Sequence, residues 1–368
     1  MIKNQLGHWA RRFSRHIDQT LFGLLLLTIM IGLFILYSAS GQNAEQMGRQ
    51  GLSLLVALAC LGLFANISPQ RLEAVAVPLY VLGLLLLIGV TVVGDVSHGA
   101  QRWLNLGVAR IQPSEMMKIA VPLMLAWYFA RREGSLRAMD YFFAALFLVI
   151  PVGLIAKQPD LGTALLISAS GFYVLFFAGL SWRLMLGIGV SFAGIVPLVW
   201  PHLHDYQRKR IMTLLDPSQD PLGSGYHIIQ SSIALGSGGL AGKGWLNGTQ
   251  SRLDFLPERH TDFIFAVFGE EFGLLGVALL ILLIIAIIAR GMVIANNAQN
   301  VFSRLLAGSI TLSFFTYAFV NMGMVSGILP VVGVPLPLIS YGGTSLVMLM
   351  IGFGILMSIQ THKKLVGS

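Results

Sequence analysis

Four ionisable side chains crowd into five residues of the sequence: Glu258, Arg259, His260 and Asp262. They stand directly before a long apolar segment, where Asp262 or Thr261 could serve only to cap a helix. A carboxylate at such a boundary is partly desolvated and can act as a general base on a hydroxyl group. Helix capping and base catalysis are therefore the two hypotheses for Asp262, and the local density of charge favours catalysis.

Glu115 and Lys118 are three residues apart inside another apolar segment, so they share one face of a helix. A charged pair inside a membrane usually marks a site or a pathway, although it can also hold helices together. Both roles are compatible, because a lysine held by a glutamate can still face a phosphate. Asp160 follows Lys157-Gln-Pro in a tight outward turn. It could be a second site carboxylate, but the local pattern favours a helix cap.

The glycine-rich segment Gly236–Trp245 superficially resembles a phosphate-binding loop. It fails that pattern, because Ser237 replaces a required glycine and Gly244 replaces the Ser or Thr after the lysine. A flexible turn is the favoured interpretation. Glu270 and Glu271 follow Asp262 in the next apolar segment, and a step of about 100° separates adjacent residues on a helix. At least one of these acids should therefore point into the bundle or pair with a polar partner.

Histidines and basic residues gather in the longest polar segment. His202, His204, Asp205 and His227 match no strong metal-binding spacing, so no dedicated metal site is predicted. The basic run Arg208–Arg210 is typical of a patch that faces lipid headgroups, and substrate binding is the weaker hypothesis.

The composition fixes the setting of these residues. Hydrophobic residues make up 55% of the 368 residues, charged residues only 11%, and the mean hydropathy is +0.77. Soluble domains carry roughly 25% charged residues, so lipid must be the solvent of this chain. The net charge of +8 then reflects cytoplasmic loops rather than nucleic-acid binding. A single cysteine, Cys60, excludes an intrachain disulfide.

Ten apolar segments approach the roughly 20 residues that cross a bilayer. The sequence thus predicts an all-α, polytopic integral membrane bundle, with residues 1–368 forming one domain. The first segment is a retained helix rather than a cleaved signal peptide, because no small-residue cleavage site follows it. The predicted spans are 19–39, 51–68, 75–94, 114–130, 141–156, 162–179, 184–200, 262–289, 305–328 and 342–361.

The distribution of Lys and Arg predicts the orientation. With the basic segment 1–18 in the cytoplasm, thirteen of the 24 Lys and Arg residues fall on the cytoplasmic side, as the positive-inside rule requires. Both termini are then cytoplasmic. The large loop 202–261, between the seventh and eighth spans, faces outward and is too rich in aromatic residues to be disordered. The Pro- and Gly-rich stretch 327–343 is predicted to dip into the membrane beside the site.

Six long strings resemble the SEDS family (shape, elongation, division and sporulation). PERHTDF and VPLPLISYGG resemble the elongation branch of that family more than the division branch. The strings are GAQRWLNLG at 99–107, QPSEMMKIA at 112–120, KQPDLGT at 157–163, GYHIIQSSIALGSGGLAGKGW at 225–245, FLPERHTDFIFAVFGEEFG at 255–273 and GILPVVGVPLPLISYGG at 327–343.

The resemblance implies a peptidoglycan glycosyltransferase of the bacterial inner membrane that polymerises lipid II during cell elongation. It implies a class B penicillin-binding protein and the elongation machinery as partners, and no nucleic acid. The essential aspartate of the family falls on Asp262, its intramembrane salt bridge on Glu115 and Lys118, and a further site motif on Asp160.

The implied chemistry fits the residues. The donor sugar is α-linked to a pyrophosphate and the polymer is β-linked, so one inverting displacement with one base, Asp262, suffices. Positive charge must stabilise the leaving pyrophosphate, with or without Mg²⁺ or Mn²⁺. Glu258 and His260 are supporting candidates. The cationic candidates are Lys118, Arg210, Lys243 and Arg259.

Two rival functions are a flippase for the lipid-linked precursor and a non-catalytic scaffold for the penicillin-binding protein. A flippase needs binding groups on both sides of the membrane, whereas the polar clusters here all face the periplasm. No internal inverted repeat is evident either. A scaffold would leave the cluster Glu258–Asp262 without a purpose beyond capping.

Overall fold

The computed structural model describes residues 16–97, 100–105, 110–134, 136–199, 201, 205–220, 223–252, 255–256 and 258–362. Outside the described residues lie 1–15 of the predicted cytoplasmic segment 1–18, the histidines His202 and His204, and the C-terminal residues 363–368.

Ten long helices of the described chain coincide with the ten predicted spans, and the predicted break between the fifth and sixth spans falls where α6 ends and α7 begins. Asp18 and Asn43 cap the first two helices by accepting hydrogen bonds from backbone N–H groups. The helices are α2 (Gln19–Ala39), α3 (Ala44–Ala65), α4 (Pro69–Val93), α5 (Pro113–Ala130), α6 (Ala138–Lys157), α7 (Leu161–Phe177), α8 (Trp182–Val199), α12 (Ile264–Asn296), α13 (Val301–Val325) and α14 (Gly343–Thr361).

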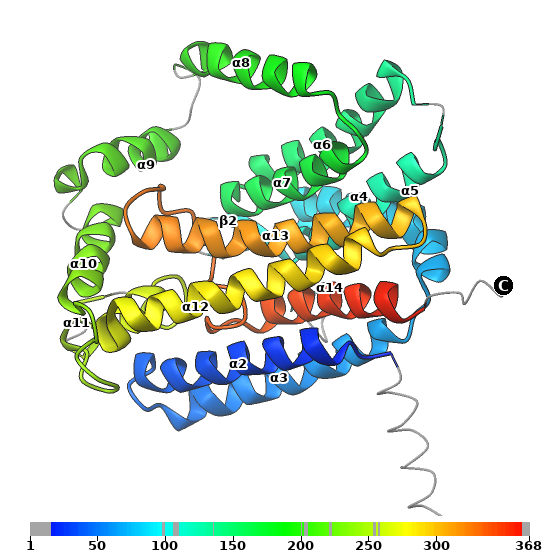
Figure 1. Cartoon of the computed structure of the whole chain (residues 1–368). Coiled ribbons are helices and arrows are strands. Elements are labelled where there is room, and N and C mark those ends of the chain that lie inside the picture. Colours follow the sequence, from blue (N-terminus) through cyan, green and yellow to red (C-terminus); the bar gives the residue numbers. More distant parts are fainter. Residues whose placement is uncertain are drawn as a thin grey trace, which may run out of the picture.

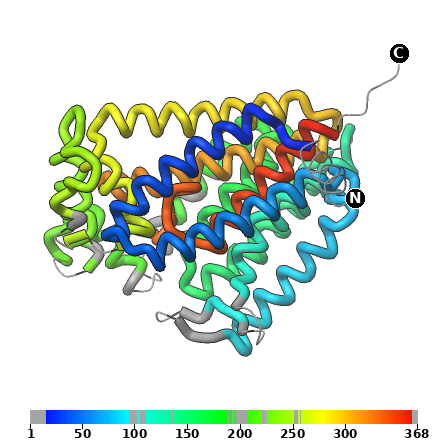
Figure 2. Tube along the Cα trace, turned by 90° about the horizontal axis from the view of Figure 1, so that it is seen from below, coloured from blue at the N-terminus to red at the C-terminus, as the bar shows by residue number. Residues whose placement is uncertain are grey.

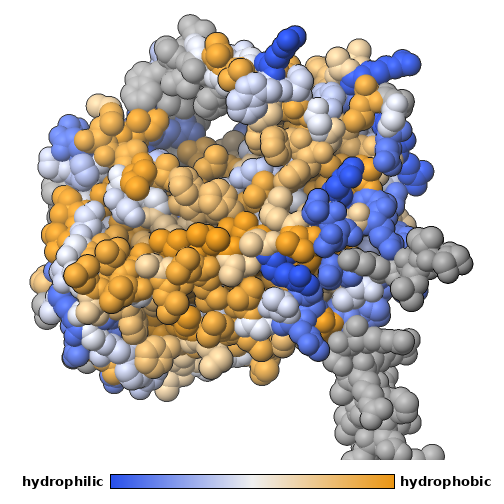
Figure 3. All heavy atoms as spheres, in the orientation of Figure 1, coloured by the Kyte–Doolittle hydropathy of each residue, from blue (hydrophilic) through white to orange (hydrophobic). Residues whose placement is uncertain are grey.

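The bundle has the surface of a membrane protein. Seven of the described helices are long and apolar enough to cross a bilayer, and α7 is a shorter apolar helix. Side chains such as Leu274, Leu275 and Leu282 on α12 are more than half exposed. Figure 3 shows a broad hydrophobic band over the middle of the molecule, with hydrophilic side chains gathered towards its two ends. Because water would penalise such a surface, lipid surrounds it, and the predicted polytopic helical bundle is confirmed.

The connections contain elements that the sequence did not indicate. A small antiparallel sheet joins α4 to α5, with β1 (Asp95–Ser97), β2 (Ala100–Asn105) and β3 (Arg110–Ile111) in that order. The long loop between α8 and α12 is largely helical. It contains α9 (Asp205–Leu215), the 3₁₀ turn η2 (Pro217–Gln219), α10 (Ser224–Ser237) and α11 (Thr249–Arg252).

The two ends of the bundle hold different segments of the chain. The His16 ring stacks on the His362 ring with centroids 4.0 Å apart, so the beginning of α2 and the end of α14 lie together. Arg290, near the end of α12, donates to Asp18 at the start of α2, with an Nε–Oδ1 distance of 3.1 Å. The beginning of α12, with α10 and α11, lies at the opposite end, on the left of Figures 1 and 2. Every predicted site residue in the described loops belongs to that second end.

Candidate active site

Asp262 lies in the turn directly before α12. The N-cap of α12 is Phe263, which makes no capping bond, so the carboxylate of Asp262 does not cap this helix. The side chain is only partly exposed. Burial, with a smaller contribution from the nearby Glu258 carboxylate, raises the pKa of Asp262 to about 6. Among the described residues, no side chain donates a hydrogen bond to this carboxylate. A partly buried carboxylate without a donor is expected of a general base.

The turn that carries Asp262 is closed by its own hydrogen bonds. Glu258 adopts a positive φ of 51°, and its carbonyl accepts bonds from the backbone N–H groups of Thr261 (3.1 Å) and Phe263 (3.3 Å). The Thr261 hydroxyl donates to the Glu258 carboxylate at 2.9 Å. The exposed side chain of Glu258 thus belongs to the turn and lies close enough to Asp262 to influence its charge.

The stretch 327–343 supports this turn from the other side. Ser340 donates from its hydroxyl to the Thr261 carbonyl at 2.5 Å, and the Tyr341 N–H donates to the His260 carbonyl at 2.9 Å. Gly333 has a φ of +72°, and a β-carbon there would lie 3.5 Å from Oδ2 of Asp262. The stretch therefore lies beside the candidate base, while its depth in the bilayer stays a prediction.

Asn321 of α13 ties both segments together. Its side-chain N–H group donates to the carbonyls of Asp262 and Val334, each at 2.8 Å. Asn321 is wholly buried. The sequence analysis missed this residue, although a polar side chain inside an apolar helix is itself a signal of a functional or organising role.

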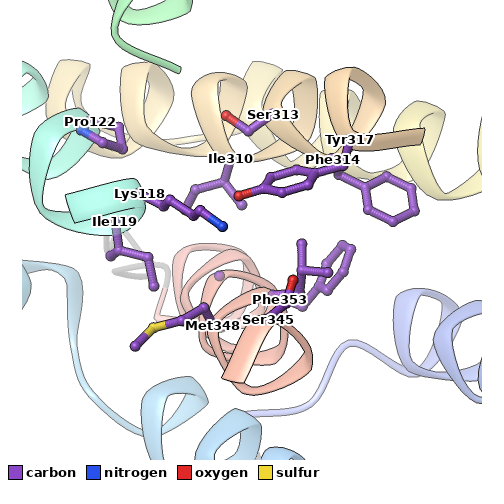
Figure 4. Close-up of a pocket in the computed structure, with 12 residues that line it drawn as sticks. Lys118, Ile119, Pro122, Ile310, Ser313, Phe314, Tyr317, Ser345, Met348 and Phe353 are labelled. Atoms are coloured by element: carbon purple, nitrogen blue, oxygen red, sulfur yellow. The ribbon is translucent and has the colours of Figure 1, made fainter. Parts of the chain in front are cut away.

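The predicted ion pair between Glu115 and Lys118 forms on α5, where both side chains are nearly buried. The Lys118 ammonium also lies 5.2 Å from the centroid of the Tyr317 ring on α13. Figure 4 shows Lys118 and Tyr317 pointing toward one another, and Ser345 nearby, across a small cavity of about 40 Å³. Tyr317, which the sequence analysis also missed, precedes Asn321 by one helical turn on the same face. The ion pair and the Asp262 turn therefore lie against adjacent turns of α13.

Asp160 forms the helix cap that the local pattern favoured. Its carboxylate accepts a bond from the Thr163 N–H at 3.2 Å at the start of α7, and the Arg102 guanidinium lies 4.0 Å away. The same turn packs on the stretch 327–343, since a β-carbon on Gly162 would lie only 2.6 Å from the Val332 carbonyl oxygen. Asp160 is thus near the site but already engaged, and a catalytic role for it stays a prediction.

Lys243 lies against α12 rather than in an open phosphate cradle. Its ammonium donates to Glu270 at 2.7 Å and to the Thr249 hydroxyl at 2.8 Å. Glu270 is wholly buried, and the same carboxylate oxygen accepts bonds from the backbone N–H groups of Thr249 (2.8 Å) and Gln250 (3.1 Å). The neighbouring acid Glu271 accepts a bond from the hydroxyl of Ser38. Both acids of this pair therefore find polar partners, as the sequence suggested.

The glycine-rich segment forms turns after α10, as we predicted, and these turns are hydrogen-bonded to α12. A break in α12 at Gly273 (φ 63°, ψ −163°) frees backbone groups, and the Leu274 N–H donates to the Gly239 carbonyl at 2.9 Å. A β-carbon on Gly238 or Gly242 would lie 2.1 Å from a carbonyl oxygen of α12. The glycines thus permit close contact between backbones. We call segment 238–250, with its bonds to α12, the latch.

The remaining predicted residues occupy different surroundings. Arg259 is partly exposed beside Gly41 at the end of α2. The His260 ring packs edge-on against the Tyr341 ring at 5.8 Å, and burial lowers the pKa of His260. Arg210 lies on α9, outside the Asp262 turn. Among the described residues, no group of three His, Cys, Asp or Glu side chains is arranged to hold a metal ion.

Comparison with known proteins gives consistent results. The family model for cell cycle proteins of the FtsW, RodA and SpoVE type matches residues 18–365. The peptidoglycan glycosyltransferase MrdB of Escherichia coli K12 is 52% identical over 351 residues, which cover 95% of each chain. The probable peptidoglycan glycosyltransferase FtsW of Geobacter metallireducens is 36% identical, covering 93% of this chain and 94% of that protein.

Solved structures agree with the sequence comparisons. A chain from a peptidoglycan synthase complex that coordinates polymerization and crosslinking superposes with a TM-score of 0.82 at 33% identity, covering 94% of this chain and 99% of that one. The rod shape determining protein RodA of Thermus thermophilus superposes with a TM-score of 0.71 at 31% identity, covering 94% and 98%.

Proposed function

Because the chain belongs to the FtsW/RodA/SpoVE family of cell cycle proteins, we propose that Asp262 is the general base of its glycosyl transfer. The chain is a RodA-like peptidoglycan glycosyltransferase embedded in the membrane by its helical bundle. Its substrate is lipid II, a disaccharide-pentapeptide on undecaprenyl pyrophosphate.

One observation supports Asp262 above the other acids of this end of the bundle. The carboxylates of Asp160 and Glu270 accept hydrogen bonds from neighbouring groups, whereas none of the described residues donates one to the Asp262 carboxylate. Burial leaves the Asp262 carboxylate with a pKa of about 6. A base of that pKa is largely ionised at neutral pH yet still accepts a proton readily.

The reaction balances with this single base. The acceptor hydroxyl oxygen attacks the anomeric carbon of the donor sugar as Asp262 removes the hydroxyl proton. The bond between that carbon and the pyrophosphate oxygen breaks, and its electron pair leaves with undecaprenyl pyrophosphate. Arg259, three residues from the base, is the nearest cationic candidate in sequence to stabilise the leaving group. Lys118 supports the same region through Tyr317 and α13.

Lys243 and a bound metal ion were also proposed from the sequence to stabilise the leaving group. Lys243 already neutralises Glu270, so its contacts favour a structural role in the latch. A bridging Mg²⁺ or Mn²⁺ stays a prediction. Measuring polymerisation with and without a chelator tests it. If a metal ion takes part, the chelator should abolish polymerisation, and adding Mg²⁺ or Mn²⁺ should restore it.

The proposed orientation places Asp262 in the periplasm and both termini in the cytoplasm of a bacterial inner membrane. Asp262 and Arg290 are 28 positions apart on α12 and its preceding turn, which corresponds to roughly 40 Å. Since Arg290 binds Asp18 at the start of α2, the candidate site and the start of α2 lie at opposite ends of the bundle. The partner we propose is a class B penicillin-binding protein of the elongation machinery, as the similarity to a peptidoglycan synthase complex supports.

Replacing Asp262 with Asn tests the proposal. The purified chain with its partner should polymerise lipid II, and Asp262→Asn should slow polymerisation by about 10²- to 10⁴-fold, the usual contribution of a general base. Asp216, a partly exposed acid at the start of η2, is the matched control, and Asp216→Asn should keep wild-type activity. Polymerisation by Asp262→Asn at the wild-type rate would refute the assignment. A flip assay in vesicles separates the enzyme from a flippase.

A further inference from the structure

A polar pocket opens at the outer end of α3, next to the proposed catalytic turn. It has a volume of about 250 Å³ and is lined by side chains from two separate segments of the chain. Tyr341, which precedes α14, forms one wall. The other lining residues lie at the start of α3: Asn43, Glu45, Gln46 and Arg49. None of these side chains has a role in the mechanism described above.

Backbone contacts connect this pocket to the base. The Tyr341 N–H donates to the His260 carbonyl at 2.9 Å, and the two rings pack with centroids 5.8 Å apart. The preceding residue, Ser340, donates to the carbonyl of Thr261, the residue before Asp262. The wall of the pocket and the turn of the base therefore form one hydrogen-bonded unit. The pocket therefore adjoins the turn that carries Asp262.

The charge and polarity of the lining exclude the pyrophosphate and the prenyl chain of a lipid-linked substrate as ligands of this pocket. Glu45 and Arg49 form an ion pair at 2.5 Å, so the lining carries no net charge. A pyrophosphate would need unmatched cations or a metal ion. A prenyl chain would need an apolar lining, whereas the lining here is mostly polar.

The remaining chemistry suits a sugar. The amide of Gln46 both donates and accepts hydrogen bonds, as the hydroxyl and acetamido groups of a hexosamine require. The Tyr341 ring adds an apolar face with a hydroxyl at its edge. Pockets for drug-sized ligands measure about 300–1,000 Å³. A pocket of about 250 Å³ therefore fits one sugar ring and not a complete disaccharide-peptide.

We propose that this pocket binds an N-acetylated sugar of the acceptor substrate and orients its hydroxyl toward Asp262. The inference rests on the proposed function. We assign the pocket to the acceptor because the general base contacts the acceptor's attacking hydroxyl. The donor would instead be held at its pyrophosphate by cations. The pocket thus raises the effective concentration of the acceptor without touching the leaving group.

Two substrate analogues separate the two sides of the reaction. One is lipid II with its attacking sugar hydroxyl blocked, so that it can only donate. The other is a lipid monophosphate disaccharide-peptide, which lacks the leaving group and can only accept. With the full chain and its partner, the concentration of each analogue is varied while the other is held constant.

The variants are Gln46→Ala and Tyr341→Phe, which keep every backbone bond described above. Each should raise KM for the accept-only analogue about 3- to 10-fold, the range expected for one lost hydrogen bond. Their KM for the donate-only analogue and their kcat at saturating acceptor should change less than twofold. Gln219→Ala, at an exposed glutamine in η2, is the matched control and should equal the wild type. Thermal unfolding in detergent checks that the variants are folded.

An unchanged KM for the acceptor, or a rise in KM for the donor instead, would overturn the inference. These outcomes differ from failure of the proposed function itself. In that case the wild-type chain would make no polymer, or Asp262→Asn would remain active.

Discussion

Asp262 and Glu270 lie eight residues apart at the same end of α12, yet their surroundings are opposite. Glu270 is wholly buried, and one of its oxygens accepts bonds from Lys243, Thr249 and Gln250 at 2.7–3.1 Å. Asp262 is partly exposed and has no recorded donor among the described residues. The first carboxylate fastens the latch to the helix, and the second is left available for a proton.

With Asp262 as the proposed base, the start of one helix supplies both rigidity and reactivity. A buried charge destabilises the fold unless it is paired and hydrogen-bonded, and Glu270 meets that condition. Asp262 does not, and the raised pKa of Asp262 reflects that lack of partners. We therefore expect changes at the latch to affect folding and changes at the Asp262 turn to affect catalysis.

The largest effect on stability should come from Lys243→Met. This change leaves Glu270 buried without its counter-charge, which typically costs about 3–5 kcal/mol of unfolding free energy. The apparent melting temperature in detergent should fall strongly. Lys209→Met is the matched control, because Lys209 pairs with Asp220 at 3.1 Å but is 63% exposed. Such pairs contribute only about 0–1 kcal/mol. Equal melting temperatures for the two variants would contradict the structural role of the latch.

A second pair of variants compares two glycines with positive φ. In Gly273→Ala the new β-carbon would lie 2.3 Å from the Gly242 nitrogen, in a backbone conformation that costs about 1–3 kcal/mol even before that clash. Gly333→Ala carries a comparable backbone cost at φ +72°, but it adds no clash, because its β-carbon meets Oδ2 of Asp262 at an ordinary 3.5 Å. We expect Gly273→Ala to lower the melting temperature more than Gly333→Ala does, and Gly333→Ala to lower kcat more than Gly273→Ala does. The reverse pattern would remove the distinction between the two regions.

Much of the fold was predictable, because an apolar run of about 20 residues has few alternatives in a bilayer. Each predicted span coincides with a helix, including the short pair separated at Lys157–Asp160. The sheet was missed because strands of two to six residues leave no periodic pattern. The latch was missed for a different reason. Its glycines are explained by a break in a helix about 30 residues away in sequence, and local patterns carry no such information.

The candidate site was predictable where ionisable residues are close in sequence, as at Glu258–Asp262, and not where distant residues come together in the fold. Tyr317 and Asn321 occur in the apolar helix α13, and only the folded chain shows that they adjoin Lys118 and Asp262. Local sequence also could not decide between capping and catalysis. The structure shows a cap for Asp160 and none for Asp262.

The third prediction concerns pH. A general base works only when it is unprotonated, so kcat/KM should fall below the pKa of about 6 at Asp262, reaching roughly a tenth of its plateau one unit lower. The pKa of Asp262 is raised in the folded chain from 3.8 to about 6. The stability of the fold therefore decreases as the pH rises between these two values, and it stays lower above pH 6. Asp262→Asn should therefore be at least as stable as the wild type at pH 7.5.

Glu258→Gln sharpens the pH test. The Glu258 carboxylate is the second cause of the raised pKa at Asp262, so its removal should move the acid limb of the rate profile to lower pH. Rates of polymerisation between pH 4.5 and 8 measure both curves. An acid limb that does not move in Glu258→Gln, or that is absent in the wild type, would show that another group limits the rate.

The smallest effect should distinguish the two aspartates that precede helices. Asp160→Ala removes the cap of α7 and should cost about 1 kcal/mol of stability, whereas Asp160→Asn keeps a capping oxygen and should cost less. Because neither change touches the proposed base, both variants should polymerise lipid II within a few-fold of the wild type. A loss in Asp160→Asn as deep as in Asp262→Asn would mean that two carboxylates share the chemistry. The Arg102–Asp160 contact would then position a catalytic group rather than a helix end.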